Sequence, residues 1–525
     1  MYERQRGNEE SVYLDADDFA DIADYYLNDD TPDYAMEALQ MGLALHPDDE
    51  VLLSVLSATY IYMHEYDKAE EVLSGLDAED SDVKYQLAQL EYAKYNRVAE
   101  AEKIWREWME MENNKEASES FKRESYIHII SSLAELRNDH DDDGSDDTDV
   151  EAVRRWVQEY IDTFHPLGRY PEDVQVADIC RDNNIPDLMA EVLTQVLEEQ
   201  PYLPKGWSNL ALAQFVQKKY PQALESCSFA LAIDPDDLDA LLTKAHSLNA
   251  LKQKEEAVSA FKDYLEKGGE IIQAIPCAEV LFAIGERDQG FQMLKKVREQ
   301  LEDALSDYKE RYEKAKNKDG VEKERVDTLA YFYNNYVDLH QKMLSDISDL
   351  YHRNGYYQEG ISVNERLVEL DKNNAEAYFM LGINHLALSQ YEEASKNFAF
   401  ALKNAKDQVL MGIDIALTFV LNDFDQFALE VLDAVSQIAP SSKSKFVKNI
   451  PAAKSITYLK MGHKDQFLRY FREACQETPG LVQKVYDGCF PKQLPFEQWS
   501  DYASKNLDKL LKNFSKDTVH LQSLM

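Results

Sequence analysis

The segment PKGWSNLALAQFVQKKYPQALESCSFALAIDPDD, residues 204–237, carries the pattern that decides the fold. Trp207 stands three residues before a Leu-Ala pair, and small residues follow at Ala223 and Cys227 before Pro235. Apolar residues spaced by three and four are typical of an amphipathic helix, so the segment predicts two successive helices. The proline and the aspartates around it predict the end of the second helix and the cap of the next one.

The same pattern returns 34 residues later and again in distant parts of the chain. The matching positions agree in residue class and in spacing. They are Phe19, Ile22, Ala23, Tyr26, Ala35 and Leu39 near the start, Leu241, Ala245, Ala257, Phe261 and Tyr264 after the quoted segment, and Tyr378, Leu381, Gly382, Ala394, Phe398 and Ala401 toward the end. One helix pair cannot bury its own apolar face, so neighbouring pairs must stack into a continuous core.

This order of a large residue, Leu-Gly, Tyr, Ala, Phe, Ala and Pro at fixed offsets resembles the tetratricopeptide-repeat family. The resemblance extends over most of the chain. It implies an all-α fold, a tetratricopeptide-like helix-pair solenoid that winds as a right-handed superhelix. The residue pattern adds a long helical hairpin insertion. It also implies a scaffold that holds proteins or peptides, but it leaves the partner open, because one fold serves many functions.

We expect six segments that differ in how regularly the pattern repeats. They are an N-terminal repeat block at 1–137, an acidic loop at 138–150, a middle repeat block at 151–272, a long irregular helical hairpin at 273–340, a C-terminal repeat block at 341–480 and a capping region at 481–525. The hairpin is expected because two long helical patterns, 289–317 and 321–353, flank an Asp-Gly pair. A polar helix near the end would cap the array.

The charge of the chain restricts its partners. Among 525 residues, 56 are Lys or Arg and 98 are Asp or Glu, which gives a net charge of −42. Such a chain repels phosphate, so we expect neither nucleic acid nor an anionic membrane as a partner. A basic or amphipathic protein or peptide is favoured. The alternative is that acidic helix faces only keep a long protein in solution.

The cysteines and the apolar runs indicate the compartment. No CxxC pair occurs among the five cysteines, which read as small core residues of a protein in a reducing environment. They are Cys180, Cys227, Cys277, Cys475 and Cys489. No run of apolar residues approaches the length of a membrane span, and the first ten residues lack an export signal. We therefore expect a cytoplasmic location.

Signatures of catalysis are absent from the sequence. It contains no GxxxxGK[ST], no GxGxxG in a strand–helix setting, no HExxH and no GxSxG. Carboxylates lie near one another throughout an acidic chain of this composition, so pairs of acids carry no information. We predict that the protein is not an enzyme and binds no cofactor.

The acidic loop begins like a calcium-binding loop but does not end like one. Asp139, Asp141, Asp143 and Gly144 match the start of such a loop, whose twelfth position supplies a bidentate carboxylate. That position is occupied by Val150. We therefore predict a solvated acidic linker and no metal site.

The repeat phase shows which residues lie on the inner face of the solenoid, where a partner would bind. Family members that clamp a peptide carboxylate use Lys, Asn and Arg on the inner helix, but the corresponding positions are Ser208, Leu212, Leu242, His246, Phe379 and Ile383, so we predict no such clamp. The inner face of two C-terminal units is instead apolar. Its residues, the C-terminal stripe, are Phe379, Ile383, Leu386, Ile413, Leu417 and Val420. This stripe is either core or a groove for an amphipathic helix or peptide, which the long hairpin itself could occupy. Glu376 and Asp414 would give the groove an acidic rim.

The favoured function is a non-catalytic protein- or peptide-binding scaffold or adaptor. Two alternatives remain at this point. One is a regulatory sensor whose solenoid closes on a small ligand or peptide, and the other is a non-catalytic subunit of an enzyme complex. The sequence does not identify the partner or the oligomeric state.

Overall fold

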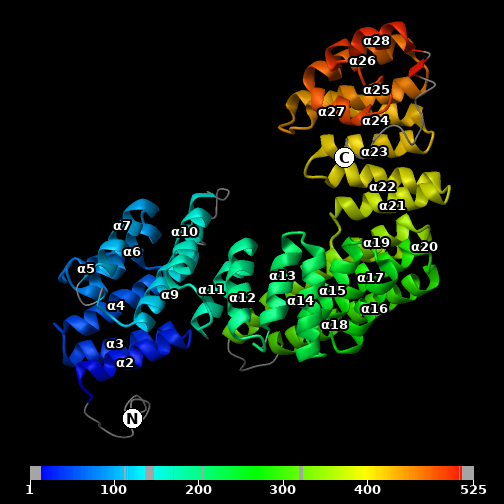
Figure 1. Cartoon of the computed structure of the whole chain (residues 1–525). Coiled ribbons are helices and arrows are strands. Elements are labelled where there is room, and N and C mark those ends of the chain that lie inside the picture. Colours follow the sequence, from blue (N-terminus) through cyan, green and yellow to red (C-terminus); the bar gives the residue numbers. More distant parts are fainter. Residues whose placement is uncertain are drawn as a thin grey trace. The chain divides into compact units, whose positions relative to one another are not determined.

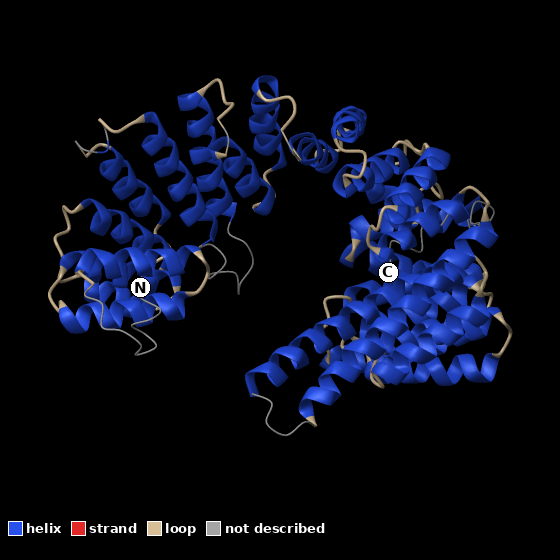
Figure 2. Ribbon diagram, turned by 90° about the horizontal axis from the view of Figure 1, so that it is seen from below, coloured by secondary structure: helices blue, strands red, loops and turns tan. Residues whose placement is uncertain are grey.

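The structure is a computed structural model of the chain. The residues that it describes are 14–111, 114, 116–135, 147–169, 171–203, 205–317, 323–507 and 509–510. Within these ranges every regular element is a helix, and Figure 2 shows no strand. The chain divides into two compact units, Met1–Gly268 and Gly269–Met525, and each is a stack of helical hairpins (Figure 1). The predicted all-α solenoid of paired helices is confirmed.

The first unit is built from short helices that pair in sequence order. They are α2 (Ala16–Asn28), α3 (Pro32–Leu45), α4 (Glu50–Tyr62), α5 (Tyr66–Leu73), α6 (Ser81–Ala93), α7 (Val98–Met109), α9 (Glu119–Glu135), α10 (Asp147–Phe164), α11 (Glu172–Asp182), α12 (Pro186–Glu199), α13 (Gly206–Val216), α14 (Tyr220–Ile233), α15 (Leu238–Ala250) and α16 (Lys254–Glu266). Within each hairpin the two helices pack on each other, and the first helices of successive hairpins also touch, as α2 touches α4 and α4 touches α6. Contacts of this kind define a solenoid.

Aspartates start several of these helices. The side chain of Asp49 accepts hydrogen bonds from the backbone N–H groups of Val51 and Leu52, and Asp237 accepts one from Ala240. Such caps satisfy N–H groups that lack partners within the first turn of a helix. The aspartates after the repeat proline therefore act as predicted from the sequence.

Small residues let the paired helices approach closely. Ala223 of α14 and Ala394 in the second unit are both buried. Replacing Ala223 with leucine is expected to overpack the α13–α14 pair and to lower the free energy of unfolding by about 1–3 kcal/mol. Urea unfolding followed by tryptophan fluorescence measures this loss. The control is Glu225→Leu, at an exposed position of α14, and equal midpoints for the two variants would contradict the packing.

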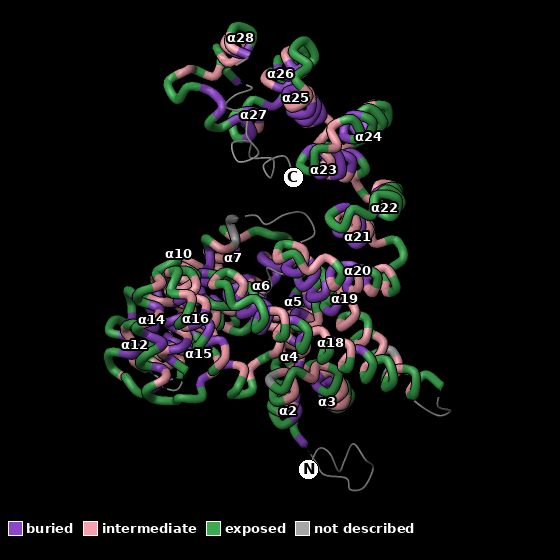
Figure 3. The backbone as a smooth tube through the Cα atoms, turned by 90° about the vertical axis from the view of Figure 1, so that its right-hand side faces the viewer, coloured by how far each residue is buried: buried purple, intermediate pink, exposed green. Residues whose placement is uncertain are grey.

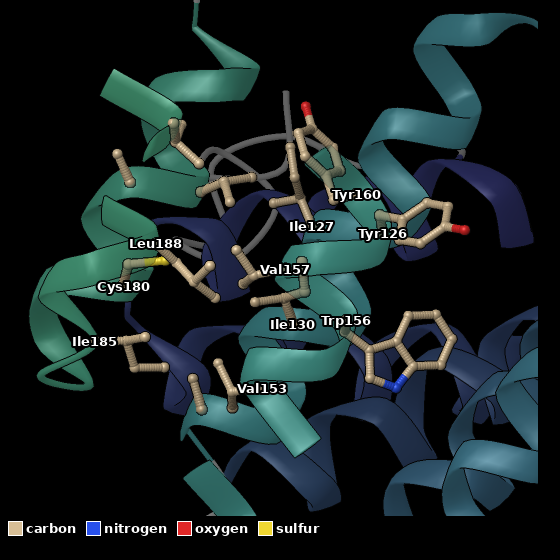
Figure 4. Close-up of a cluster of buried hydrophobic side chains, with 14 of the residues drawn as sticks. Tyr126, Ile127, Ile130, Val153, Trp156, Val157, Tyr160, Cys180, Ile185 and Leu188 are labelled. Carbon is tan, nitrogen blue, oxygen red and sulfur yellow. The ribbon is translucent and has the colours of Figure 1, made fainter. Parts of the chain in front are cut away.

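A large core lies where α9, α10, α11 and α12 meet (Figure 4). Trp156 and Tyr160 of α10 are fully buried and contact Tyr126 of α9 edge to face, at ring-centroid distances of 5.6 and 6.1 Å. The opposite face of α10 presents Val153 and Val157 toward α11 and α12 (Figure 4). Because α10 is apolar on two faces, it joins the hairpins on either side of it.

A buried ion pair closes the same region. The guanidinium of Arg123 on α9 lies 2.5 Å from a carboxylate oxygen of Asp173 on α11, and both side chains are at most 5% exposed. The same carboxylate accepts hydrogen bonds from the Tyr160 hydroxyl (2.6 Å) and from the backbone N–H groups of Gly168 (2.7 Å) and Arg169 (2.6 Å). The buried charge is thus fully hydrogen-bonded, as burial requires.

The second unit contains longer and shorter helices. They are α17 (Ala274–Ala283), α18 (Arg287–Lys316), α19 (Lys323–Arg353), α20 (Tyr357–Leu370), α21 (Ala375–Ala387), α22 (Tyr391–Asn404), α23 (Gln408–Leu421), α24 (Asp425–Ile438), α25 (Ile450–Lys460), α26 (Lys464–Glu477), α27 (Pro479–Val485) and α28 (Trp499–Lys505). The long helices α18 and α19 pack on each other, and they also pack on α17 and α20. The long hairpin therefore takes part in the stack.

Glycine allows close contact within the α21–α22 pair. A Cβ atom at Gly382 would lie 2.5 Å from a ring carbon of Phe398, closer than two carbon atoms can approach.

Deeper in the unit, α25 is buried along most of its length (Figure 3). No helix in the described part of the chain combines the length and the apolar character needed to cross a membrane.

Candidate functional site

A concave cavity of about 540 Å³ lies in the first unit. Its walls come from the first helices of consecutive hairpins, α2, α4, α6 and α9, with one residue from α7. We call it the N-terminal groove. Its lining residues are Asp24, Leu27, Ser54, Val55, Ala58, Ile61, Tyr62, Asp82, Tyr85, Gln86, Gln89, Trp108, Phe121, Glu124, Ser125, His128 and Ser132.

Helical spacing explains why these residues share one surface. On α4 the lining positions are 54, 55, 58, 61 and 62, and on α6 they are 82, 85, 86 and 89. Residues three and four apart lie on the same face of a helix. The opposite faces of α4 and α6 pack on α5 and α7. The groove is therefore the face that these helices leave after they have formed their hairpins.

Aromatic rings form one wall of the N-terminal groove. The ring of Trp108 lies 5.2 Å from that of Tyr85 and 6.3 Å from that of Phe121, measured between centroids. Trp108 is nearly buried and donates its indole N–H to the Ser81 hydroxyl, at 2.9 Å, whereas Phe121 is 37% exposed. Rings held in this way offer apolar contact at little cost in conformational entropy.

Hydrogen bonds between helices hold the floor of the groove. The hydroxyl oxygen of Ser132 on α9 lies 2.9 Å from the hydroxyl oxygen of Tyr85, and it accepts a hydrogen bond from the Gln89 amide at 3.0 Å. The amide of Gln86 donates to the backbone carbonyl of Ser54 on α4, at 3.2 Å. These bonds connect α6 to both neighbouring first helices, so the floor is preorganised.

The remaining wall is acidic. Asp24, Asp82 and Glu124 line the groove, and none of the described residues that line it is a lysine or an arginine. Although the side chains of Asp24 and Asp82 are exposed, partial desolvation inside the cavity raises the pKa of both carboxyl groups. The negative charges of Asp21 and Asp82 raise the pKa of Asp24 further, and Asp80 does the same for Asp82. The groove thus concentrates negative charge that nothing in its described wall neutralises.

Another concavity of the first unit, of about 500 Å³, is lined by Lys94 and by residues 64–68. Its charges are already paired. The ammonium of Lys94 lies 2.6 Å from a carboxylate oxygen of Asp67 and 2.7 Å from one of Glu70, and these bonds raise the pKa of Lys94. It is therefore a weaker candidate for a site that recognises charge.

The C-terminal stripe is mostly inside the protein. Ile413, Leu417 and Val420 are at most 2% exposed and share a buried cluster with residues of α25, and Leu386 is 7% exposed. Two residues of the stripe, Phe379 and Ile383 on α21, remain half-buried. In this structure α25 covers the face of α23 that the repeat phase presents as a groove. Partner binding at Phe379 and Ile383 stays a prediction.

The acidic residues expected beside that stripe differ from each other. Glu376 is exposed, whereas Asp414 is half-buried and has a carboxylate oxygen without a hydrogen-bond partner in the described structure. Burial, with a contribution from the negative charge of Asp407, raises the pKa of Asp414 to about 7. Near neutral pH this carboxyl group is partly protonated, so it contributes less than a full charge to a rim.

The acidic loop can be followed only in part. Asp139, Asp141, Asp143 and Gly144 lie outside the described residues, whereas Val150 falls on α10. Among the residues that are described, no cluster of three or more His, Cys, Asp or Glu side chains could hold a metal ion.

The N-terminal groove was missed in the sequence, although a signal for it exists. Asp24 and Ala58 are one 34-residue period apart, and so are Leu27 and Ile61. Each of these four residues comes directly after a residue that packs inside its hairpin. The signal is weak because acidic and small residues at such positions are also typical of a helix face in contact with water.

Comparison with known proteins identifies the repeat. The family model of the tetratricopeptide repeat matches residues 204–237. No curated protein matches the sequence. Among solved structures, YrrB, a TPR protein with an unusual peptide-binding site, is 17% identical and covers 42% of this chain and 96% of its own, with a TM-score of 0.30. A tetratricopeptide repeat protein from Parabacteroides merdae is 14% identical and covers 66% of this chain and 99% of its own, with a TM-score of 0.33.

The match to the tetratricopeptide-repeat model covers both helices of the α13–α14 hairpin. That hairpin packs on α12 and α15, within a series of hairpins joined in the same way. The chain is therefore a protein that contains a tetratricopeptide repeat, at residues 204–237, within a solenoid of paired helices.

Proposed function

We propose that the protein is a non-catalytic scaffold that binds a protein or peptide segment in the N-terminal groove. The observation that carries this proposal is the groove itself, a cavity of about 540 Å³ with a rigid aromatic wall and a hydrogen-bonded floor. An extended peptide fits a surface of this kind, because its side chains can enter pockets between successive first helices. The cytoplasmic location remains a prediction.

Filling the groove tests this function. Ala58 lies on α4 at the wall of the groove, and Ala58→Tyr is expected to reduce capture of synthetic nonapeptide pools by at least tenfold, because the added ring occupies the peptide's space. The full-length chain is immobilised, and bound peptides are measured by mass spectrometry. The control is Ala44→Tyr, at an exposed position of α3. Equal capture by the two variants, with unchanged melting curves, would contradict the proposal.

A further inference from the structure

The charge and the shape of the N-terminal groove together point to the chemistry of its partner. Two carboxylates on different helices, Asp24 of α2 and Asp82 of α6, lie close enough that the charge of Asp82 acts on Asp24. Neither side chain forms an ion pair with a lysine or arginine in the described structure, although many other acids of this unit do. Charge within the groove is therefore left for a ligand to neutralise.

We propose that the N-terminal groove binds a positively charged peptide segment, with a lysine or arginine side chain placed beside Asp24 and Asp82. This inference rests on the proposed function and specifies its partner. Glu124 of α9 lines the same cavity and adds a third negative charge to its wall. His128 of α9 also lines the cavity, and its described wall contains no lysine or arginine that would repel a bound cation.

The aromatic wall fits the rest of such a side chain. Lysine and arginine carry an apolar stem below the charge, and this stem packs on aromatic surface while the charged end reaches a carboxylate. A cation also interacts favourably with the face of an aromatic ring. Tyr85, Trp108 and Phe121 supply these rings in the same cavity as the carboxylates. An acidic or purely apolar segment would leave the carboxylates desolvated without a partner.

The position of both carboxylates inside the cavity makes the pairing more favourable than on an open surface. The raised pKa of Asp24 and of Asp82 has burial as its first cause, so each carboxylate has already lost part of its hydration before a ligand arrives. A cation that enters the groove therefore gains Coulomb energy against a reduced desolvation penalty. Because both side chains are exposed, the interaction is sensitive to salt.

Synthetic peptide pools test the proposal with the full-length chain. Each pool contains nonapeptides with one fixed central residue, Lys, Arg, Gln, Glu or Leu, and an equal mixture of uncharged residues elsewhere. We expect the Lys and Arg pools to be captured at least tenfold more than the Gln pool, with a smaller ratio in high salt. The double variant Asp24→Asn/Asp82→Asn should lose this preference.

The matched control changes the same charge elsewhere. Asp48→Asn/Glu198→Gln also removes two negative charges, at exposed positions outside the groove, and it should keep the preference. Melting curves show whether each variant is folded. A preference that survives in Asp24→Asn/Asp82→Asn, or one lost equally in the control, would overturn the proposal, since overall charge would then explain it.

Other outcomes separate this inference from the proposed function. If all pools are captured alike and Ala58→Tyr abolishes capture, the groove binds peptides but does not select for positive charge, and the inference fails alone. If no pool is captured, the proposed function fails as well. Spermidine is the probe for a free small cation. Binding of spermidine as tight as that of the Lys pool would overturn a peptide as the occupant.

Discussion

Replacing Asp173 with alanine is expected to lower the free energy of unfolding of the first unit by about 3–5 kcal/mol. The substitution removes the buried counter-charge of Arg123, which keeps only its ion pair with the exposed Glu119, and it removes the acceptor for the Tyr160 hydroxyl and for two backbone N–H groups. Breaking a buried ion pair is among the largest single causes of destabilisation. Asp173→Asn keeps the shape but loses the charge, so it should fall between alanine and wild type.

Tryptophan fluorescence during urea unfolding measures this effect, because four of the five tryptophans lie in the first unit. The control is Asp178→Ala on the same helix, which removes an exposed ion pair with Arg181 and should change stability by less than about 1 kcal/mol. Similar midpoints for Asp173→Ala and Asp178→Ala would show that the buried pair does not stabilise the fold.

A comparable loss is expected in the second unit from Phe471→Ala. Phe471 is fully buried, and its ring lies 5.2 Å from that of Phe467, 5.1 Å from that of Tyr486 and 5.7 Å from that of Phe490. Removing it leaves a cavity among rings that cannot collapse easily, so the free energy of unfolding should fall by about 3–5 kcal/mol. Phe471→Leu, which fills most of that space, should cost less.

Trp499 reports on this region because its ring stacks on that of Phe490 at 4.1 Å. With 5-fluorotryptophan incorporated, its ¹⁹F resonance can be followed apart from those of the first unit during thermal unfolding. Arg472→Ala, at an exposed position of α26, is the control. If Phe471→Ala unfolds at the temperature of this control, the aromatic cluster is not the core of the unit.

Residue size at fixed spacing predicted the helix pairs well. Ala223 and Ala394 hold small-residue positions of the repeat pattern and are buried, and the ring of Phe398 lies against Gly382 as a close helix crossing requires. Close approach of two backbones depends on small residues at one position in each helix, and that condition is visible in the sequence itself.

The surface that a helix presents depends on more than its own sequence. Ile413 and Leu417 lie on the inner face of their repeat by phase, yet they belong to a buried cluster with Ala452 and Ile456 of α25. The repeat pattern is weak in that hairpin, so its position against α23 could not be derived. Periodicity identifies an apolar face, but it does not show which other element covers it.

The N-terminal groove is an open surface that the sequence does not reveal. Asp24 and Asp82 are acidic residues in a chain that has 98 of them, and nothing in their local sequence distinguishes them from residues on an open surface. Their role depends on the curvature that brings α2, α4, α6 and α9 around one cavity. Curvature results from small rotations between successive hairpins, which no single repeat encodes.

Contacts between neighbouring hairpins have a mechanical consequence. In the first unit each hairpin touches the one before it and the one after it, as α2 touches α4 and α4 touches α6. We therefore expect a small tilt at one junction to add to the tilts at the others without breaking any helix, as in a spring. The N-terminal groove spans several such junctions, so we expect the strain caused by a bound segment to be shared along the array and not to be concentrated in the hydrogen-bonded floor.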